Sequence, residues 1–278
     1  MQVTTLARAK VNLCLHVTGR RGDGYHLLDS LVVFADISDV VTVTAADRLA
    51  LRIDGPEAQG LAADDSNLVM RAARLIAPDL RADIRLTKNL PVASGIGGGS
   101  ADAAATLRAI ARMAGTPMPP EPALLRLGSD VPACLASAPC RMRGIGDDLG
   151  HVPTLPALDV LLVNPRVMVS TPAVFAALDR RDNAPLPALL PDWPDAARFC
   201  DWLSQQRNDL LAPALTLAPE IATALAVIRD TGCLFAGMSG SGATCFGLYP
   251  RDGYSAKSAE AHLFVERPAW WAKSGRIS

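Results

Sequence analysis

The chain has 278 residues, half of them hydrophobic, and a formal net charge of −1 at pH 7. This length suits two domains with a substantial buried core, and the near-neutral charge argues against a disordered chain or a basic nucleic-acid-binding face. The apolar runs are short and stay well below the roughly 20 residues that span a bilayer. We therefore expect a soluble globular protein with no nucleic-acid or membrane partner; the sequence leaves monomer and homodimer open.

The composition and the N-terminal pattern predict a cytoplasmic protein. The first residues begin an alternating strand pattern at once, without the leader of a targeting peptide. The six cysteines include no CxxC pair and the four histidines no HxxxH, so neither a disulfide framework nor a structural zinc site is indicated. Free thiols within apolar segments fit a reducing compartment.

The first part of the chain predicts a sheet. Residues 9–17 alternate with the period of a half-buried strand, which places Lys10 and Asn12 on one face. Residues 30–37 are expected to form another strand. Residues 39–53 follow and predict further strand structure around a polar loop.

A helix and a strand–loop–helix unit follow. Ser66 is the candidate N-cap of the first helix, and Pro78 lies just past its end. Residues 82–88 alternate as a strand, residues 89–100 form a glycine-rich loop, and residues 101–115 predict a helix that ends at a glycine.

The pattern restarts at Pro153, so we expect domains over residues 1–152 and 153–278. Before this boundary, we expect short helices over 120–128 and 129–136 and a strand and turn over 141–149. After it, we expect a strand over 157–165, a helix near 171–179, a Pro- and Asp-rich stretch over 183–195, and further helices before the glycine-rich segment 233–250.

The glycine-rich loop predicts a phosphate site. Gly95, Gly97, Gly98 and Gly99 precede a helix whose first turn carries Ser100. The first amides of a helix lack intrahelical partners and lie at the positive end of its dipole, so they bind phosphate, and glycines allow close approach. The Ser100 hydroxyl could contact a phosphate or Mg²⁺. The alternative is a flexible capped turn.

Three common nucleotide and hydrolase motifs are excluded. The loop fits neither GxxxxGK[ST], because no lysine precedes Ser100, nor GxGxxG, because Ser100 stands in place of the third glycine. Ser241 lies in GMSGSG, which lacks the first glycine of the GxSxG elbow of hydrolases.

Three segments resemble the conserved motifs of the GHMP kinases (galactokinase, homoserine kinase, mevalonate kinase and relatives). They are AKVNLCLHV at 9–17, PVASGIGGGSADAA at 91–104 and MSGSGATCF at 238–246. The resemblance covers essentially the whole chain. The segments GRRGDGYH, LGSDVPACL, VSTPAVF and RNDL are further similar to the branch that phosphorylates the 2-hydroxyl of a cytidine-diphosphate-linked methylerythritol, on the non-mevalonate route to isoprenoid precursors.

The resemblance implies a fold and a phosphoryl donor. The fold is an α/β N-terminal domain of the ribosomal protein S5 domain 2 type followed by an α+β ferredoxin-like C-terminal domain. The donor is ATP with Mg²⁺, and Asp102 receives no metal role because related chains vary there. The residues implied to bind ATP are Asn67, Lys88, Pro91, Val92, Ala93, Ser94, Gly95, Ile96, Gly97, Gly98, Gly99, Ser100 and Ala101, with Ser100 as the candidate metal ligand.

The resemblance also implies the catalytic residues. Asp130 matches the catalytic aspartate and Lys10 its partner lysine. On local grounds alone, Asp130 before Pro132 could simply cap a helix. Asn67 and Lys88 match positions near the adenine, although each is also a plain surface residue at the end of an element.

A cytosine site is implied by the remaining matches. Tyr25 would stack on the base, His26 would hydrogen bond its edge, and Phe175 would lie on its other side. Thr171 would lie on the same wall and Asn12 near the reacting hydroxyl. Without the resemblance, Tyr25 and His26 would be a surface turn pair and Phe175 a core residue.

Three other functions compete with this hypothesis. A GHMP kinase for homoserine or mevalonate would have no cytosine clamp. A nucleotide-binding relative without catalysis would not need Lys10 and Asp130. An interaction scaffold would use the glycine loop only structurally.

Overall fold

The computed structural model describes residues 1–277 and contains two compact units that interleave along the chain. The long strands β1 (Gln2–Arg20) and β2 (His26–Ala45) contribute one part to each unit. The division into domains at residue 152 stays a prediction. Unit 1 comprises Met1–Lys10, Ser38–Val92 and Gly97–Ser137, and unit 2 comprises Val11–Ile37, Ala93–Ile96 and Ala138–Ser278.

The strands of unit 1 are polar on one face and apolar on the other. The later part of β2 pairs antiparallel with β4 (Ala82–Thr87), and β3 (Ala50–Asp54) pairs parallel with β4. Ile84 and Leu86 of β4 are buried, whereas Arg85 points outward and forms an ion pair with Asp54 at the end of β3. This period-2 alternation confirms the strand predicted over 82–88.

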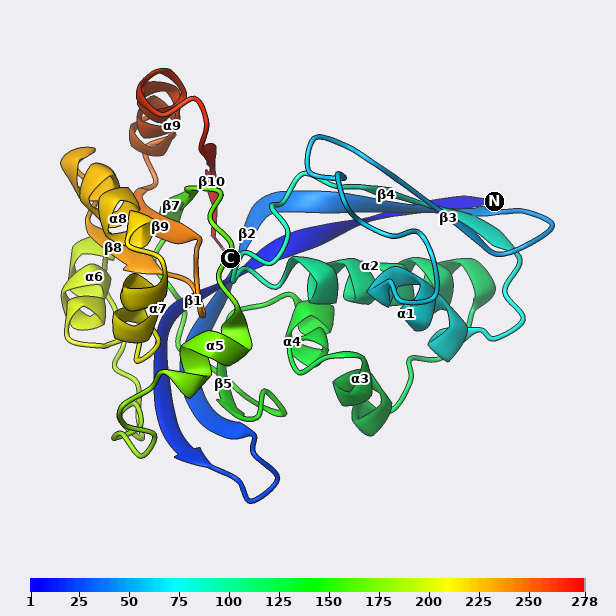
Figure 1. Cartoon of the computed structure of the whole chain (residues 1–278), viewed down its shortest axis with the longest axis horizontal. Helices are drawn as coiled ribbons and strands as arrows, with labels where there is room; N and C mark the ends of the chain where they lie inside the picture. Colours follow the sequence, from blue (N-terminus) through cyan, green and yellow to red (C-terminus); the bar gives the residue numbers. More distant parts are fainter. Residues whose placement is uncertain (278) are drawn as a thin grey trace. The chain divides into compact units, whose positions relative to one another are not determined.

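Four helices of unit 1 lie on one face of these strands (Figure 1). They are α1 (Leu68–Ile76), α2 (Gly98–Ala114), α3 (Glu121–Leu127) and α4 (Val131–Ala136). α2 packs closely against α1 and α4 because its buried positions are mostly alanine. Gly115 ends α2 in the left-handed conformation, at φ 66°, as the sequence predicted.

Three expectations about local structure are wrong. The Asn67 side chain, not Ser66, caps α1 by accepting from the Val69 amide, because the Ser66 hydroxyl donates to Asp64. The strand expected over 30–37 does not end there, since β2 continues to Ala45. β1 is not half-buried either: Lys10 is 4% and Asn12 1% exposed, because side chains on both faces are covered.

Unit 2 contains a ferredoxin-like sheet. Its strands are β7 (Leu158–Asn164), β8 (Phe235–Met238), β9 (Cys245–Pro250) and β10 (Trp271–Arg276), in the antiparallel spatial order β10–β7–β9–β8. With helices after β7 and after β9, this is the split βαββαβ pattern. It confirms the predicted ferredoxin-like domain.

Within residues 1–277, the remaining elements of unit 2 include two short strands and five helices. β5 (Cys140–Gly144) pairs with β2 and with β6 (Asp148–Gly150). The helices are α5 (Thr171–Ala176), α6 (Ala196–Ser204), α7 (Leu211–Leu217), α8 (Glu220–Asp230) and α9 (Ser255–Glu266).

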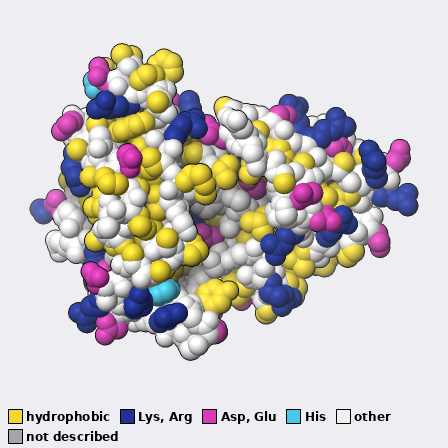
Figure 2. Space-filling model, in the orientation of Figure 1, with side chains coloured by type: hydrophobic (Ala, Val, Ile, Leu, Met, Phe, Trp, Pro, Cys, Tyr) yellow, Lys and Arg dark blue, Asp and Glu magenta, His cyan; other side chains and the backbone are white. Residues whose placement is uncertain are grey.

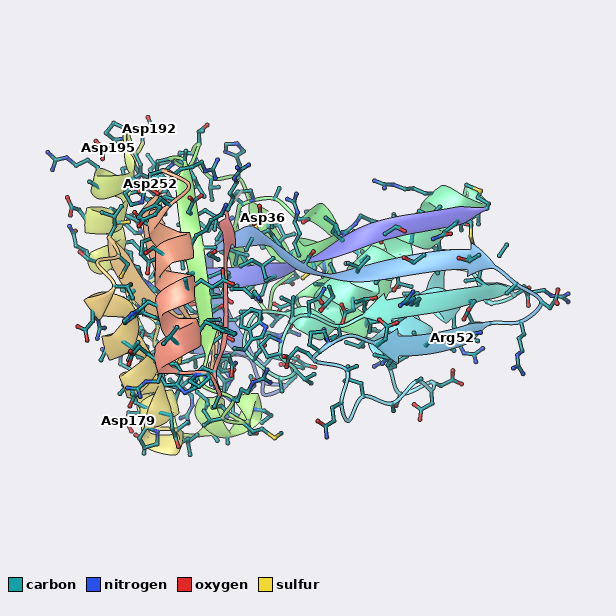
Figure 3. The ribbon with its side chains drawn as sticks, turned by 90° about the horizontal axis from the view of Figure 1, so that it is seen from above. Asp36, Arg52, Asp179, Asp192, Asp195 and Asp252 are labelled. Carbon is teal, nitrogen blue, oxygen red and sulfur yellow. The ribbon has the colours of Figure 1, made fainter. Side chains whose placement is uncertain are left out.

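A hydrophobic core joins the sheet of unit 2 to α8 and α9. Leu161 of β7, Ile228 of α8 and Leu263 of α9 belong to one buried cluster. Aspartates initiate two of the surrounding helices (Figure 3): Asp195 accepts from an amide of the first turn of α6, and Asp252 accepts from amides at the start of α9. Sequence reasoning assigned no structure to α9 or β10.

The Pro- and Asp-rich segment 183–195 is tied to β2 and β5 by a buried ion pair. Arg141 donates to both carboxylate oxygens of Asp29, at 2.8 and 2.7 Å, and to three successive carbonyls beginning at Leu186. The Leu186 amide in turn donates to Asp29. Hydrogen bonding to Asp29 raises the pKa of Arg141. This segment is therefore held by polar contacts and by the buried side chains of Leu186 and Trp193, without a helix or strand.

The surface mixes charges of both signs. On the face drawn in Figure 2, Lys and Arg side chains alternate with Asp and Glu. Among the helices of residues 1–277, no single one is long and apolar enough to cross a membrane, although α7 and α8, bent by 117° to one another, meet the length and composition test together.

Candidate active site

Lys10 and Asp130 form an ion pair in unit 1. Lys10 Nζ lies 2.9 Å from Asp130 Oδ1, and the two side chains are 4% and 28% exposed. Asp130 occupies the N-cap position of α4, yet its side chain makes no capping hydrogen bond. The carboxylate is therefore directed to Lys10 instead of the helix, and its partial exposure leaves room for a substrate hydroxyl.

The second half of the glycine loop starts α2. Gly97 takes the N-cap position with φ +67°, and a Cβ placed on it would lie 3.2 Å from Lys10 Cβ. Gly98 begins the helix itself, so it does not have the positive φ of Gly97. Without a capping side chain at Gly97, the first amides of α2 suit an anion.

The first half of the loop belongs to unit 2, where the third motif packs against it. Gly95 has φ +77°, and a Cβ there would lie 2.5 Å from the Ser239 carbonyl oxygen, so only glycine fits. The Ser239 hydroxyl donates to the Gly95 carbonyl at 2.9 Å and accepts from the Asn12 amide at 3.1 Å. Ser239 thus links the second motif to the first.

Two further interactions hold the third motif. Asn208 Nδ2 donates to the carbonyls of Met238 and Gly240, both at 2.9 Å, on either side of Ser239. The Thr244 amide donates to the Ser94 carbonyl at 3.1 Å. The turn that follows β8 is therefore fixed from both ends.

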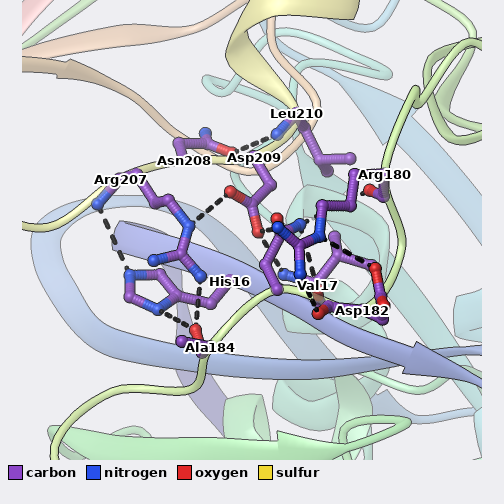
Figure 4. Close-up of polar contacts among 10 residues, drawn as sticks. His16, Val17, Arg180, Asp182, Ala184, Arg207, Asn208, Asp209 and Leu210 are labelled. Atoms are coloured by element: carbon purple, nitrogen blue, oxygen red, sulfur yellow. Dashed lines mark hydrogen bonds and ion pairs between the residues drawn. The ribbon is translucent and has the colours of Figure 1, made fainter.

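The RNDL segment at 207–210 is bound to β1 (Figure 4). Asp209 accepts from the Val17 amide and from Arg207, at 2.7 Å each. His16 Nε2 accepts from the Arg207 amide at 3.4 Å, which requires the neutral ring. Burial lowers the pKa of His16, which favours this neutral form.

Two of the predicted cytosine residues, His26 and Phe175, lie in contact in unit 2. The rings of His26 and Phe175 stack with centroids 4.6 Å apart and planes 25° apart, while Tyr25 is 59% exposed. His26 Nε2 is buried and has no hydrogen-bond partner among the described residues. Burial, followed by Arg20 and Arg181, lowers the pKa of His26. A neutral imidazole with one unused nitrogen can hydrogen bond a ligand.

The other predicted substrate residues have polar partners nearby in unit 2. Thr171 Oγ1 and Ser241 Oγ share a hydrogen bond at 2.7 Å. The Asn12 side chain donates to Ser30 at 2.7 Å, and the Ser30 hydroxyl donates to the Cys14 carbonyl at 2.6 Å. Ser30 and Ser241 were not predicted as site residues.

Lys88 is not a surface residue. It is 3% exposed, and its ammonium donates to Asp39 and, at 2.8 Å, to Asp102. Burial raises the pKa of Asp102 to about 7, although the charge of Lys88 opposes this shift. The other candidate adenine residue, Asn67, uses its side chain to cap α1 and to donate to the Ala62 carbonyl.

The side chains suit a metal ion only when phosphate supplies most of its ligands. In residues 1–277, no three His, Cys, Asp or Glu side chains gather as a metal site. Magnesium bound through substrate phosphates needs only one or two protein ligands. The Ser100 hydroxyl lies beside the loop before α4, since a Cβ on Gly128 would lie 3.4 Å from it.

Two family models match the chain. The GHMP kinases N terminal domain matches residues 67–148, and the GHMP kinases C terminal domain matches residues 186–263. The chain belongs to the GHMP kinase family. A relative from Ruegeria pomeroyi, named 4-diphosphocytidyl-2-C-methyl-D-erythritol kinase, is 62% identical over 278 residues, which cover 100% of both chains.

Solved structures agree with this GHMP kinase fold. A crystal structure of 4-(cytidine 5'-diphospho)-2C-methyl-D-erythritol kinase is 31% identical, covers 99% of both chains and has a TM-score of 0.78. A homoserine kinase from Cytophaga hutchinsonii is 17% identical, with a TM-score of 0.63, and covers 100% of this chain and 94% of its own. At that identity, the likeness concerns the fold alone.

Within this GHMP kinase, the structure brings the predicted residues together in two groups. Lys10, Asp130 and Gly97 adjoin in unit 1, and His26 and Phe175 adjoin in unit 2. The residues that sequence reasoning missed are polar and buried: Asp39, Ser30, Ser239, Asp29 and Arg141. The available signal was the acid at position 39, in a largely apolar segment that also contains Asp36.

Proposed function

We propose that this chain is an ATP-dependent kinase that phosphorylates the 2-hydroxyl of 4-diphosphocytidyl-2-C-methyl-D-erythritol, a step of non-mevalonate isoprenoid precursor formation. The observation that carries the proposal is the 62% identity, over the full length, to a relative of that name. We also assign it to the cytoplasm, as a monomer or homodimer.

The ion pair of Lys10 and Asp130 carries the chemical step. The acceptor oxygen attacks the γ-phosphorus and a new P–O bond forms. The bond to the bridging oxygen breaks, and ADP leaves with that electron pair. The hydroxyl proton passes to the Asp130 carboxylate, which Lys10 holds at 2.9 Å. The ammonium also stabilises negative charge on the transferred group, since phosphoryl transfer depends mainly on alignment and charge stabilisation.

The glycine loop binds the triphosphate. Amides at the start of α2 contact phosphate oxygens because Gly97, Gly98 and Gly99 place no side chain over them. Bound Mg²⁺ would neutralise phosphate charge, with Ser100 as its protein ligand. The remaining ATP contacts come from Pro91, Val92, Ala93, Ser94, Gly95, Ile96, Ala101, Asn67 and the backbone at Lys88.

The aromatic group selects the cytidine end of the substrate. Tyr25 and Phe175 flank the base, and the His26 nitrogen that has no protein partner hydrogen bonds its edge. His26 stacks on Phe175 at 4.6 Å, so a base that takes this face of Phe175 displaces the imidazole toward the base edge. Thr171 contributes to the same wall, and Asn12 contacts the substrate near its reacting hydroxyl.

ATP consumption with a panel of acceptors tests this function. The purified chain is assayed for ADP release with 4-diphosphocytidyl-2-C-methyl-D-erythritol, homoserine and mevalonate, each with and without Mg²⁺. We expect activity only with the cytidine compound and only with the metal. Efficient phosphorylation of homoserine or mevalonate instead would refute the substrate assignment, and ATP binding without turnover of any acceptor would favour a non-catalytic relative.

A further inference from the structure

Three charged side chains of unit 1 are buried together beneath the start of α2. They come from β2 (Asp39), the residue after β4 (Lys88) and the second turn of α2 (Asp102), and their side chains are 0%, 3% and 5% exposed. The Lys88 ammonium donates to both carboxylates. Burying three charges is costly unless they are paired and hydrogen-bonded, so this cluster requires an explanation beyond packing.

The cluster fixes the segment that leads into the glycine loop. Asp39 Oδ1 accepts from the amides of Asn89 and Leu90, at 2.5 and 2.8 Å. The backbone of Lys88 is itself held, because its amide donates to the Asp54 carbonyl at 2.7 Å. The chain is therefore rigidly placed immediately before Pro91, where the loop begins.

The same ammonium also fixes the far end of the loop. It lies 2.8 Å from Asp102 Oδ2 in α2, and a Cβ on Gly98 would lie 3.3 Å from Nζ. Lys88 thus connects the start of the loop to the start of α2. Both connected ends lie in unit 1.

We propose that Lys88 is a positioning residue for ATP: by binding Asp39 and Asp102 together, it holds the two ends of the phosphate loop at a fixed separation. The amides of Gly98, Gly99 and Ser100 are then already arranged before ATP binds. The conformational entropy of ordering them is lost during folding, so it does not weaken ATP binding. This inference rests on the proposed function and deepens it. This role differs from direct binding of ATP by the Lys88 side chain. Its ammonium is shared by two buried carboxylates, so it acts on ATP through the position of the loop.

Hydrogen exchange and ATP binding of Lys88→Met in the full chain test the proposal. Exchange at the amides of residues 97–101 is measured by mass spectrometry without nucleotide, and ATP affinity by calorimetry. We expect faster exchange at these amides and an ATP Kd raised at least about tenfold, which corresponds to about 1.4 kcal/mol. At saturating ATP, kcat should change by less than about threefold, because Lys88 does not contact the reacting atoms. The matched control is Lys257→Met, since Lys257 is an exposed lysine of α9.

A second pair of variants keeps the test informative if Lys88→Met does not fold. Asp102→Asn retains an oxygen that accepts from Lys88 and should keep ATP affinity and loop exchange within about threefold of wild type. Asp102→Ala removes the acceptor and should reproduce the Lys88→Met effect. Equal affinity and equal exchange in Asp102→Ala and wild type would overturn the positioning role.

The readouts also separate this inference from the function on which it rests. If wild type consumes no ATP with the cytidine substrate, the proposed function fails, while the exchange comparison still decides whether Lys88 orders the loop. If wild type is active and folded Lys88→Met binds ATP with unchanged affinity and exchange, only the positioning role fails.

Discussion

Replacement of Asp130 by Asn should abolish most catalysis without disturbing the fold. Asp130 Oδ1 lies 2.9 Å from Lys10 Nζ, and the carboxylate makes no capping bond to α4, so formation of that helix does not depend on its charge. The amide keeps the shape and can still accept from Lys10, but it cannot take the proton. A positioned acid–base group contributes about 10²–10⁴-fold, or about 2.7–5.4 kcal/mol of transition-state stabilisation.

The assay separates chemistry from binding. We expect kcat for ADP release to fall by about 10²–10⁴-fold, with the ATP Kd from calorimetry and the thermal midpoint close to wild type. Asp195→Asn is the matched control: Asp195 also occupies an N-cap position, where Asn is an equally good cap, and its activity should not change.

A double-mutant cycle with Lys10→Met sharpens the result. If Lys10 and Asp130 act as one unit, each single variant should lose about as much as the double variant. A loss of kcat under about threefold in Asp130→Asn, with ATP binding intact, would refute the catalytic assignment and leave Asp130 with a structural role only.

Three further predictions test the other parts of the molecule. Gly98→Val should raise the ATP Kd by about tenfold or more, since losing one hydrogen bond to a charged group costs about 1.5–3 kcal/mol; unchanged affinity in a folded variant would contradict phosphate binding there. Tyr25→Ala should raise KM for the cytidine substrate about tenfold, by analogy with base stacking worth about 1–3 kcal/mol, with kcat nearly unchanged, and a uracil analogue should be a poor substrate of wild type; an unchanged KM would argue against base stacking. Arg141→Met leaves Asp29 buried without its partner and should lower the free energy of unfolding in urea by about 3–5 kcal/mol, whereas Arg85→Met, which breaks an exposed pair, should cost less than about 1 kcal/mol; equal losses would show that burial is not decisive.

The sequence predicted most elements of the fold. It missed α9 and β10 and chose the wrong cap for α1, and its other errors concern burial. The pattern over 82–88 predicted β4 because one face of that strand is polar and exposed. The same reasoning failed for β1, where Lys10, Asn12 and His16 are polar but buried by partners distant in the chain. An alternating pattern shows which residues of a strand are polar and which are apolar. It indicates which face is exposed only when the polar side chains have no partners inside the protein. The break expected in β2 has the same origin, because it falls beside Asp39, a polar residue that is buried.

The sequence predicted the members of the site better than their connections. The glycine cluster predicted an anion site because helix N-termini bind phosphate wherever they occur. No local signal pairs Lys88 with Asp39 and Asp102, which lie 49 and 14 residues away. Such a cluster forms only when three elements pack together, so its existence depends on the tertiary fold.

Contacts between the three motifs restrict which residue types each motif can contain. A side chain at Gly95 would overlap the carbonyl oxygen of Ser239, and the Ser239 hydroxyl is in turn occupied by the Gly95 carbonyl and the Asn12 amide. Gly97 has φ +67°, and a Cβ there would press against Lys10 at 3.2 Å, so glycine is favoured at this position. Phosphate binding alone would explain glycine at the start of α2, but it would not explain glycine at position 95 or serine at position 239. The three motifs are therefore more informative together than the phosphate loop is alone. The residue type at a position in one motif is restricted by the backbone or side chain of another motif that packs against it.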